Sequence, residues 1–554
     1  MRTSIRTYRS SIPTVNRFQG VLVMRTRLVL FGTALSFLAA GSAAAQRQGP
    51  PGQRPGGQRP AAERDSGAAD SSVGVAPVER VSTTQHTITI DGKPVAYTAR
   101  AGTMVLRDST GKPDATVFYI SYTKDGVDPG TRPVTFFFNG GPGSASIWLD
   151  EGIMSPKHPE MGPAGSEPAP PYTLVDNPNS PLDVTDLVQV DAMMTGYSRP
   201  APGVKASDFT GAVNDVEMFG QFIRDYLDKY DRWASPKYLF GESYGTFRSA
   251  GLASELQERE GIELNGIMLL GTVLDFQYIS QDPSNDIAYS TFLPTYTATA
   301  WYHKKLPSSL QGESLEQVVA QSRQYAFGDY LTALAKGNDL SPSDRQAVAQ
   351  KLSDLTGIST QYLMNTNLRL DAGSFRTELL RDQRLIMGRY DTRLTGINGN
   401  AAAQRQDYDP SDVAPAGAFM AAFMRYLHDD LKYSTDLQYY TGGHTGRWDY
   451  SSLNSRGFPS ETESLRLAMA KDPYLHVMVG AGYYDTATPF ANAEYTFTHL
   501  GFDQTYKDRV QFKYYESGHM AYLNQSSAKQ LKSDIANFIA STQHLTPVTA
   551  QASH

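Results

Sequence analysis

The sequence predicts an α/β fold in which helices cover both faces of a mostly parallel sheet that carries a helical insertion. Short apolar segments alternate with amphipathic segments over 81–280 and again over 441–542, as expected where crossover helices join parallel strands. Between them, residues 281–440 show mostly helical spacing of apolar residues and no such alternation. We therefore expect this middle segment to form a cap inserted into the sheet domain.

The pattern of apolar residues predicts individual strands and helices along the chain. Alternating residues at 86–90 and 95–101 flank Asp91-Gly92, a pattern typical of a β-hairpin. Further strands are predicted at 115–122, 134–138, 187–190, 237–240, 267–270, 475–479 and 510–515, and helices at 209–230, 246–258, 489–500 and 526–540. After about residue 542 the chain has no apolar pattern that predicts packing.

Composition narrows the class of protein. A chain of 554 residues with 40% hydrophobic and 19% charged residues can bury a large core. A net charge of −7 without any basic block argues against nucleic acid as a partner. Because there is no cysteine, disulfides and cysteine-ligated metals are excluded, and histidine–carboxylate sites are the one kind of metal site left open. We expect no metal and no cofactor.

The N-terminal 45 residues have the pattern of a leader and signal peptide. Met24-Arg25-Thr26-Arg27 is basic, residues 28–40 are apolar, and Ala43-Ala44-Ala45 offers a cleavage site before Gln46. The apolar run is too short to span a bilayer as a mature helix. Residues 46–80 are rich in Pro, Gly and Gln and predict a flexible linker. The expected product is periplasmic or secreted and has no membrane span, whether translation starts at Met1 or at Met24.

One short segment carries the first sign of chemistry. Gly241-Glu242-Ser243-Tyr244-Gly245 lies between a predicted strand and a predicted helix. In that context G-x-S-x-G is the nucleophile elbow of the α/β-hydrolase fold, in which the glycines allow a tight turn that exposes the serine Oγ. The alternative is a plain Gly/Ser turn. A base, an orienting acid and an oxyanion hole elsewhere in the chain decide between the two.

Candidates for the orienting acid and the base lie where the α/β-hydrolase fold places these groups. Asp485 and His519 each directly follow a late predicted strand, and the order Ser, acid, His is that of α/β-hydrolases. The carboxyl ends of parallel strands meet at one edge of a sheet, so these side chains should lie near Ser243. We predict that Ser243 is the nucleophile, His519 the general base and then acid, and Asp485 its orienting group. His444, between Gly443 and Thr445, is a weaker candidate for a loop at the pocket.

The oxyanion hole needs two backbone N–H donors. Tyr244, directly after the nucleophile, supplies one. The Gly-rich segment Asn139-Gly140-Gly141-Pro142-Gly143 follows the predicted strand 134–138, and we assign the second donor to Gly141. A plain turn is the alternative there.

These residues carry a resemblance to a known family. The segment Asn139-Gly140-Gly141-Pro142-Gly143-Ser144-Ala145-Ser146 is similar to the Asn-Gly-Gly-Pro-Gly-Cys-Ser-Ser motif of serine carboxypeptidases. The elbow resembles their Gly-Glu-Ser-Tyr-Gly, Gly518-His519-Met520 resembles their Gly-His-Met, and 190–198 resembles their Asp-x-Pro-x-Gly-x-Gly-Phe-Ser stretch. The resemblance covers about residues 90–540 and is weakest through the cap.

The resemblance implies a reaction and a set of substrate-binding residues. Members of the family hydrolyse the C-terminal bond of a peptide through an acyl-enzyme and bind the terminal carboxylate with an asparagine and protonated glutamates. These map to Asn139 and Glu242, and Met520 maps to the methionine of the Gly-His-Met motif. A glutamate donates to a carboxylate only while it is protonated, so acidic working conditions and peptide substrates with a free C-terminus are expected.

The sequence departs from the family pattern at three places. Ser144 replaces the motif cysteine, Phe137 replaces the tryptophan of many members, and Ile153 stands near the position of the second carboxylate-binding glutamate. Glu151 and Glu160 are the candidate substitutes. An esterase or acyltransferase on the same scaffold therefore stays open beside the carboxypeptidase, and a non-catalytic binding protein is a third, weaker alternative. The cap sets the side-chain preference of the pocket.

Overall fold

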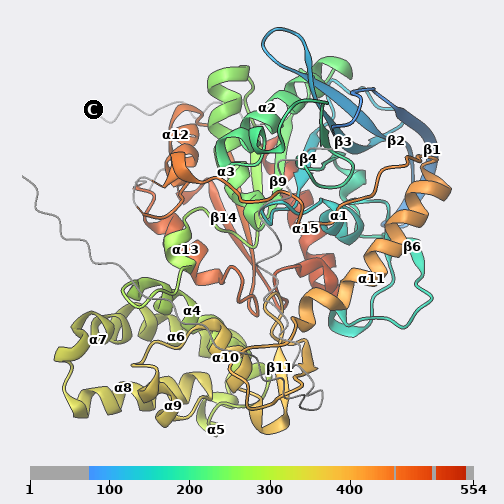
Figure 1. Cartoon of the computed structure of the whole chain (residues 1–554). Helices are drawn as coiled ribbons and strands as arrows, with labels where there is room; N and C mark the ends of the chain where they lie inside the picture. Colours follow the sequence, from blue (N-terminus) through green and yellow to red (C-terminus); the bar gives the residue numbers. More distant parts are fainter. Residues whose placement is uncertain (1–73, 455–456, 502–506, 545–554) are drawn as a thin grey trace, which may run out of the picture. The chain divides into compact units, whose positions relative to one another are not determined.

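The computed structural model describes residues 74–454, 457–501 and 507–544, so the predicted signal peptide and nearly all of the linker lie outside the described residues. A ten-stranded sheet has the order β1-β2-β3-β7-β4-β9-β10-β13-β14, with β8 paired to β3 (Figure 1). Its strands are β1 (Val81–Ile90), β2 (Lys93–Arg107), β3 (Pro113–Lys124), β4 (Val134–Phe138), β7 (Asp186–Val190), β8 (Arg199–Pro200), β9 (Lys237–Glu242), β10 (Gly266–Leu270), β13 (His476–Gly482) and β14 (Val510–Tyr515). The pairs from β1 to β7 are antiparallel, and those from β7 to β14 are parallel. The predicted α/β-hydrolase fold is confirmed.

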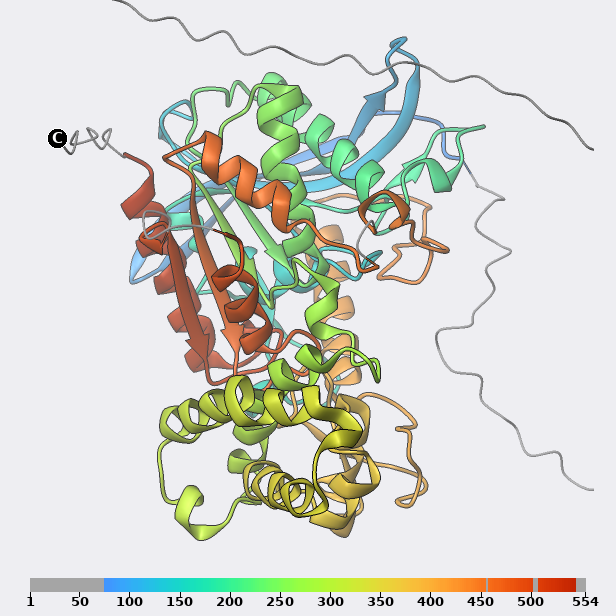
Figure 2. The ribbon, with the colours of Figure 1, turned by 90° about the vertical axis from the view of Figure 1, so that its left-hand side faces the viewer.

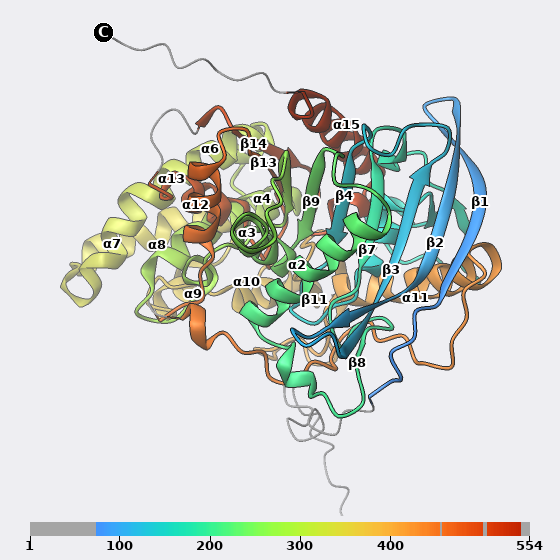
Figure 3. The same cartoon turned by 90° about the horizontal axis from the view of Figure 1, so that it is seen from above.

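The central strands are apolar throughout because both faces of the sheet are covered. Every residue of β4, β7 and β10 is buried. Phe137 belongs to the apolar cluster of one face, whereas Phe136 and Phe138 belong to that of the other, as the two-residue period of a strand requires. The helices that supply one face are α2 (Ala212–Lys229), α3 (Tyr244–Glu255), α12 (Thr462–Lys471) and α13 (Phe490–Thr498), and α15 (Gln525–Thr542) supplies the other (Figure 3).

The inserted cap has an apolar cluster of its own. This cluster draws on residues between Tyr289 and Met387 and belongs to the group of helices below the sheet in Figure 2. The cap elements are α4 (Asp286–Tyr302), α5 (Ser308–Gln311), α6 (Leu315–Tyr325), α7 (Leu331–Lys336), α8 (Pro342–Thr356), α9 (Thr360–Asn365), α10 (Ala372–Glu378) and the hairpin β11 (Leu385–Met387) with β12 (Thr395–Ile397).

Helix α11 (Pro410–Arg425) departs from the expected division. The sequence grouped it with the cap, but Phe419 and Phe423 pack in the apolar cluster of the main sheet. An amphipathic pattern shows that a helix has an apolar face, but it does not show which element covers that face. Three smaller elements complete this side of the sheet domain: α1 (Ile147–Leu149) and the pair β5 (Lys157–Pro159) and β6 (Leu174–Asp176).

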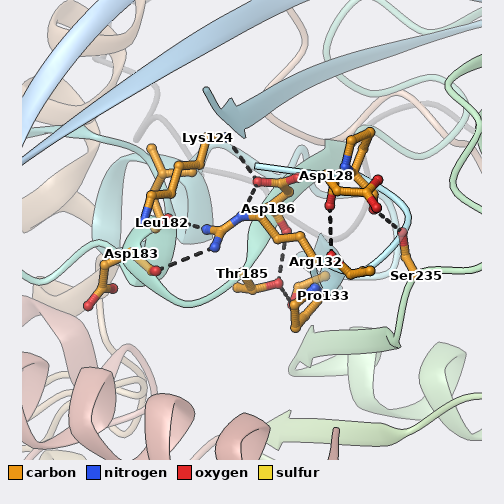
Figure 4. A network of polar contacts seen from close by, with 12 residues as sticks. Lys124, Asp128, Arg132, Pro133, Leu182, Asp183, Thr185, Asp186 and Ser235 are labelled. Atoms are coloured by element: carbon orange, nitrogen blue, oxygen red, sulfur yellow. Dashed lines mark hydrogen bonds and ion pairs between the residues drawn. The ribbon is translucent and has the colours of Figure 1, made fainter. Parts of the chain in front are cut away.

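A buried ionic network holds the amino ends of β4 and β7 together (Figure 4). Asp186 accepts from Nε of Arg132 and from Nη1 of Arg232, each at 2.7 Å, and from the backbone N–H of Lys124 at 2.9 Å. The side chains of Asp186, Arg132 and Arg232 are each at most 9% exposed. This network lies at the opposite end of the strands from Ser243, so it stabilises the sheet away from the edge that holds Ser243.

No helix within the described ranges is both long and apolar enough to cross a membrane.

Candidate active site

Ser243 occupies a sharp turn between β9 and α3. Its φ of 60° and ψ of −130° lie in a region that non-glycine residues rarely adopt, which stores strain at this residue. A Cβ on Gly241 would lie 2.2 Å from the carbonyl oxygen of Gly245, so the turn closes only with glycine at 241. The Ser243 N–H donates to the carbonyl of Leu270 at 2.9 Å, which ties the turn to the neighbouring strand.

Asp485 is fully buried and fully hydrogen-bonded. Its Oδ1 accepts from the backbone N–H groups of Ala487 at 2.7 Å and Thr488 at 3.0 Å. Its Oδ2 accepts from the Thr488 hydroxyl at 2.7 Å and lies 2.7 Å from Nδ1 of His519. A carboxylate beside Nδ1 places the ring proton there and leaves Nε2 as the acceptor. Thr488 was not predicted from the sequence; it lies three residues after the acid, on the same loop.

His519 is set up as a base. Burial alone would lower the pKa of His519, but the charge of Asp485, the hydrogen bond to it and the charge of Glu242 raise that pKa above its ordinary value. Its Nε2 is buried and makes no hydrogen bond within the described residues, and His519 lines the same cavity as Ser243. Nε2 is therefore free to accept a hydrogen bond from a group in this cavity.

The cap holds the histidine loop from the other side. The His519 N–H donates to the carbonyl of Tyr390 at 2.6 Å, and the Gly518 N–H donates to Oδ2 of Asp391 at 3.0 Å. Arg393 forms an ion pair with Asp391 at 2.6 Å. No sequence signal pointed to these residues, because their distance from His519 is set by the docking of the cap.

The Gly-rich loop after β4 packs directly on the end of helix α3. Tyr244 opens that helix, so its N–H has no partner within the helix. A Cβ on Gly140 would lie 2.3 Å from this nitrogen. Gly141 follows with a φ of 105° and lines the cavity. The structure thus packs the loop that carries Gly141 against the backbone of Tyr244, the residue after Ser243.

A buried ion pair anchors this loop. Arg248 binds Asp215 through two contacts of 2.7 and 3.1 Å and donates to the carbonyl of Asn139 at 2.8 Å. On the other side of the loop, Asp191 accepts from the Ser146 N–H at 2.7 Å. Asp191 belongs to the segment 190–198 singled out in the sequence, and its contact gives that segment a structural role.

Asn139 and Glu242 form a hydrogen-bonded pair at the floor of the site. Nδ2 of Asn139 donates to Oε1 of Glu242 at 2.9 Å, and its Oδ1 accepts from the Leu149 N–H at 2.8 Å, which fixes the amide orientation. Glu242 is 3% exposed. Burial raises the pKa of Glu242 to about 7. The charge of His519 and the polar groups of Tyr522 and Asn139 lower this pKa, but by less than burial raises it. The carboxyl is therefore protonated at mildly acidic pH.

These residues line a cavity of about 370 Å³, within the usual range for a small-molecule site. Met520, Asn139, Glu242, Ser243 and His519 all contribute to it. The lining residues that sequence reasoning missed come from α1, the cap, α11 and the 438–444 loop: Trp148, Arg389, Tyr390, Asp412, Pro415, Ala416, Thr441 and Gly442.

Three other candidates lie outside the cavity lining. His444 stacks on Tyr440 with ring centroids 3.6 Å apart, while its loop contributes Thr441 and Gly442 instead. Glu151 is fully buried and Glu160 is exposed, and neither lines the cavity. In the described part of the chain, no cluster of His, Asp and Glu is arranged to hold a metal ion.

Comparison with known proteins agrees with the motifs. The sequence profile of the family described as "Serine carboxypeptidase" matches residues 93–551. Two curated relatives come from Arthroderma benhamiae: a "Carboxypeptidase Y homolog", 28% identical over 143 residues (26% of each chain), and a "Probable serine carboxypeptidase", 26% identical over 163 residues (27% of this chain and 28% of the relative). The chain thus matches about a quarter of the length of these relatives.

Solved structures with some likeness include a proline iminopeptidase from Mycobacterium smegmatis, 14% identical with a TM-score of 0.34 over 80% of this chain and 98% of that one. A carboxyl esterase from Bacillus coagulans is 13% identical with a TM-score of 0.31 over the same shares. At these scores neither structure carries an argument about this chain.

Proposed function

Because the chain belongs to the serine carboxypeptidase family, we propose that it is a serine peptidase that releases C-terminal residues from peptides through an acyl-enzyme. One observation carries the proposal: the buried Asn139–Glu242 pair lies in the same cavity as Ser243 and His519. A hydrolase that ignored the substrate terminus would gain nothing from a buried carboxyl next to its nucleophile, because burial of the free oxygen Oε2 of Glu242 costs free energy.

The reaction follows from the roles of the triad. Ser243 Oγ attacks the carbonyl carbon of the last peptide bond while Nε2 of His519 takes the hydroxyl proton. The N–H groups of Gly141 and Tyr244 bind the oxyanion, and Asp485 stabilises the imidazolium. The C–N bond then breaks, and His519 gives its proton to the departing amino group. Water, deprotonated by His519, hydrolyses the ester and restores the Ser243 hydroxyl.

Glu242 and Asn139 would bind the substrate's terminal carboxylate. Nδ2 of Asn139 uses one hydrogen on Glu242 and has a second to offer. Neutral Glu242 donates its own proton, whereas ionised Glu242 sets two negative charges against each other. Since the pKa of Glu242 is raised by burial to about 7, peptide KM should climb as pH rises through that value. Met520 lines the same cavity and would contact the substrate beside them.

The test is KM against pH for a peptide and for an ester without a free carboxylate. Glu242→Gln keeps a neutral donor at every pH, so its peptide KM should stay nearly flat where that of the wild type rises. Glu461→Gln is a matched control, because Glu461 is also buried with a pKa raised to about 7 but lies outside the cavity. It should follow the wild type. A flat wild-type KM, or a Glu242→Gln enzyme with the same rise, would contradict the proposal.

An esterase or acyltransferase is the second candidate. It is favoured because neither candidate for the second carboxylate-binding glutamate, Glu151 or Glu160, contributes to the cavity lining, and nor does Ile153. Comparison of a blocked peptide with its C-terminal amide separates the two: a carboxypeptidase cleaves only the free acid, whereas an enzyme that ignores the terminus treats both alike. Labelling of Ser243 by a fluorophosphonate excludes the non-catalytic alternative.

We also propose that the protein is exported. The support is the sequence pattern of residues 24–46, and N-terminal sequencing of protein from the native host tests it. The mature chain should begin at or near Gln46. A membrane-bound form that retains residues 28–45 would argue for an anchor instead.

A further inference from the structure

We propose that the Tyr522 hydroxyl is the second partner of the Glu242 carboxyl and sets the upper pH limit at which this site binds a peptide's C-terminal carboxylate. The inference rests on the proposed function and adds a residue to it that no sequence motif indicated. Tyr522 acts through Glu242 and is therefore a positioning residue.

Oε2 of Glu242 and the hydroxyl of Tyr522 are neighbouring buried groups that no other side chain satisfies among the described residues. Oε1 of Glu242 accepts from Asn139, while Oε2 is buried and makes no hydrogen bond within the described residues. The Tyr522 hydroxyl is likewise buried and unbonded there. It lies close enough to act on Glu242 and on Asn139, although the contact is not closed to ordinary hydrogen-bond geometry. Two unpaired buried polar groups side by side cost free energy that a short movement recovers.

Tyr522 reaches the carboxyl from its buried side. It lies in the short turn Ala521–Leu523, three residues after His519, and does not line the cavity that holds Ser243. Its ring lies against Gly152, where a Cβ would come within 2.3 Å of both Cδ2 and Cε2. The absence of a side chain at 152 thus makes the room for this ring, and the cavity side of Glu242 stays open for substrate.

One acid, Asp485, acts on Glu242, and its charge raises the pKa of Glu242. The groups that act on Glu242 are His519, Tyr522, Asp485 and Asn139. Glu151 interacts instead with Asp150. A second carboxyl would lose its proton as pH rises, whereas a phenol keeps it. Burial and the charge of Glu242 raise the pKa of Tyr522 well above its ordinary value, so the Tyr522 hydroxyl remains a neutral donor over the pH range in which Glu242 titrates.

A hydrogen bond donated to a carboxylate favours its ionised form, so Tyr522 lowers the pKa of Glu242 against the larger, opposite effect of burial. Loss of the hydroxyl should leave Glu242 protonated to a higher pH. The enzyme would then hold its low peptide KM further into the alkaline range.

The experiment compares peptide KM from about pH 5 to 9 in wild type, Tyr522→Phe and Glu242→Gln, with ester kcat as a second readout. Tyr522→Phe should move the rise in peptide KM upward by about one pH unit and leave ester kcat within about threefold. Tyr330→Phe is the control, because it also removes a buried hydroxyl, bonded to the Leu368 carbonyl at 2.7 Å in the cap. It should not move the rise.

The outcomes separate the two proposals. If Glu242→Gln abolishes the rise but Tyr522→Phe leaves it in place, Tyr522 does not tune Glu242 and the proposed function stands. If wild-type KM is flat, both fail. Should Tyr522→Phe fold poorly, Gly152→Ala displaces the ring without removing the hydroxyl and must move the rise in the same direction; an unmoved rise there overturns the inference.

Discussion

A single methyl group at residue 140 tests the oxyanion assignment. The Cβ of alanine there would lie 2.3 Å from the Tyr244 nitrogen, 2.6 Å from the Gly245 nitrogen and 2.7 Å from the Tyr244 Cα. All three neighbours are backbone atoms, which cannot rotate away. Since real Cβ contacts essentially never fall below 3.0 Å, the Gly-rich loop and the start of α3 must move apart by about 0.7 Å or more.

The size of the effect follows from the geometry of the donor. An oxyanion donor works at about 2.7–3.1 Å from the developing charge, and removal of one costs about 10²–10³ in kcat. Displacement of the Tyr244 N–H should therefore lower kcat of Gly140→Ala by about 10²-fold on peptide and ester alike, because both substrates form an oxyanion. The concentration of competent sites is measured by active-site titration, so that kcat refers to folded enzyme only.

Gly312→Ala is the matched control. Its Cβ would meet only the Ser308 carbonyl at 3.5 Å, and its φ of −80° suits any residue. This variant should keep wild-type kcat. A Gly140→Ala enzyme within about threefold of wild type, or one whose loss disappears after correction for folded sites, would refute the placement of the oxyanion hole at Tyr244.

Four further predictions concern the triad and the buried charges. Ser243→Ala should lower turnover by about 10³-fold or more with an unchanged melting temperature by circular dichroism; near-wild-type activity would rule out the elbow. Asp485→Asn should lower kcat by about 10³–10⁴-fold, and because Asp485 raises the pKa of His519, the acid limb of the ester kcat/KM profile should move to lower pH. Asp186→Ala leaves two buried arginines unpaired and should cost about 3–5 kcal/mol of unfolding free energy in urea, while kcat per folded molecule stays unchanged. Burial raises the pKa of Glu151 well above its ordinary value, so the folded protein binds the extra proton and loses stability as pH rises above that ordinary value. Glu151→Gln should remove this loss and be more stable than wild type at pH 8 by about 1–3 kcal/mol; a difference that does not grow with pH would contradict it.

Local structure, and the chain order of the proposed triad residues, could be predicted from the sequence itself. The predicted strands 134–138 and 510–515 coincide with β4 and β14, because both are short and rich in β-branched and aromatic residues, which favours a strand over a helix. The nucleophile elbow could also be predicted, because its strand, its glycine-flanked serine and its helix are contiguous in the chain. The strain at Ser243 and the close approach of Gly241 to Gly245 appear only in the structure, where the neighbouring strand holds the turn through the bond from the Ser243 N–H to Leu270.

The environment of each side chain was decided by the tertiary structure. Arg389 and Tyr390 reach the cavity only because the cap docks there, and Asp412 reaches it because α11 packs on the sheet domain. All three lie more than 100 residues from Ser243 in the chain. The raised pKa of Glu242, to about 7, arises from burial, which depends on elements throughout the fold. The position of Tyr522 beside Glu242 likewise needs the gap left by Gly152. Spacing along a chain determines which groups are present and in what order, whereas their free energies of ionisation depend on distances that packing alone sets.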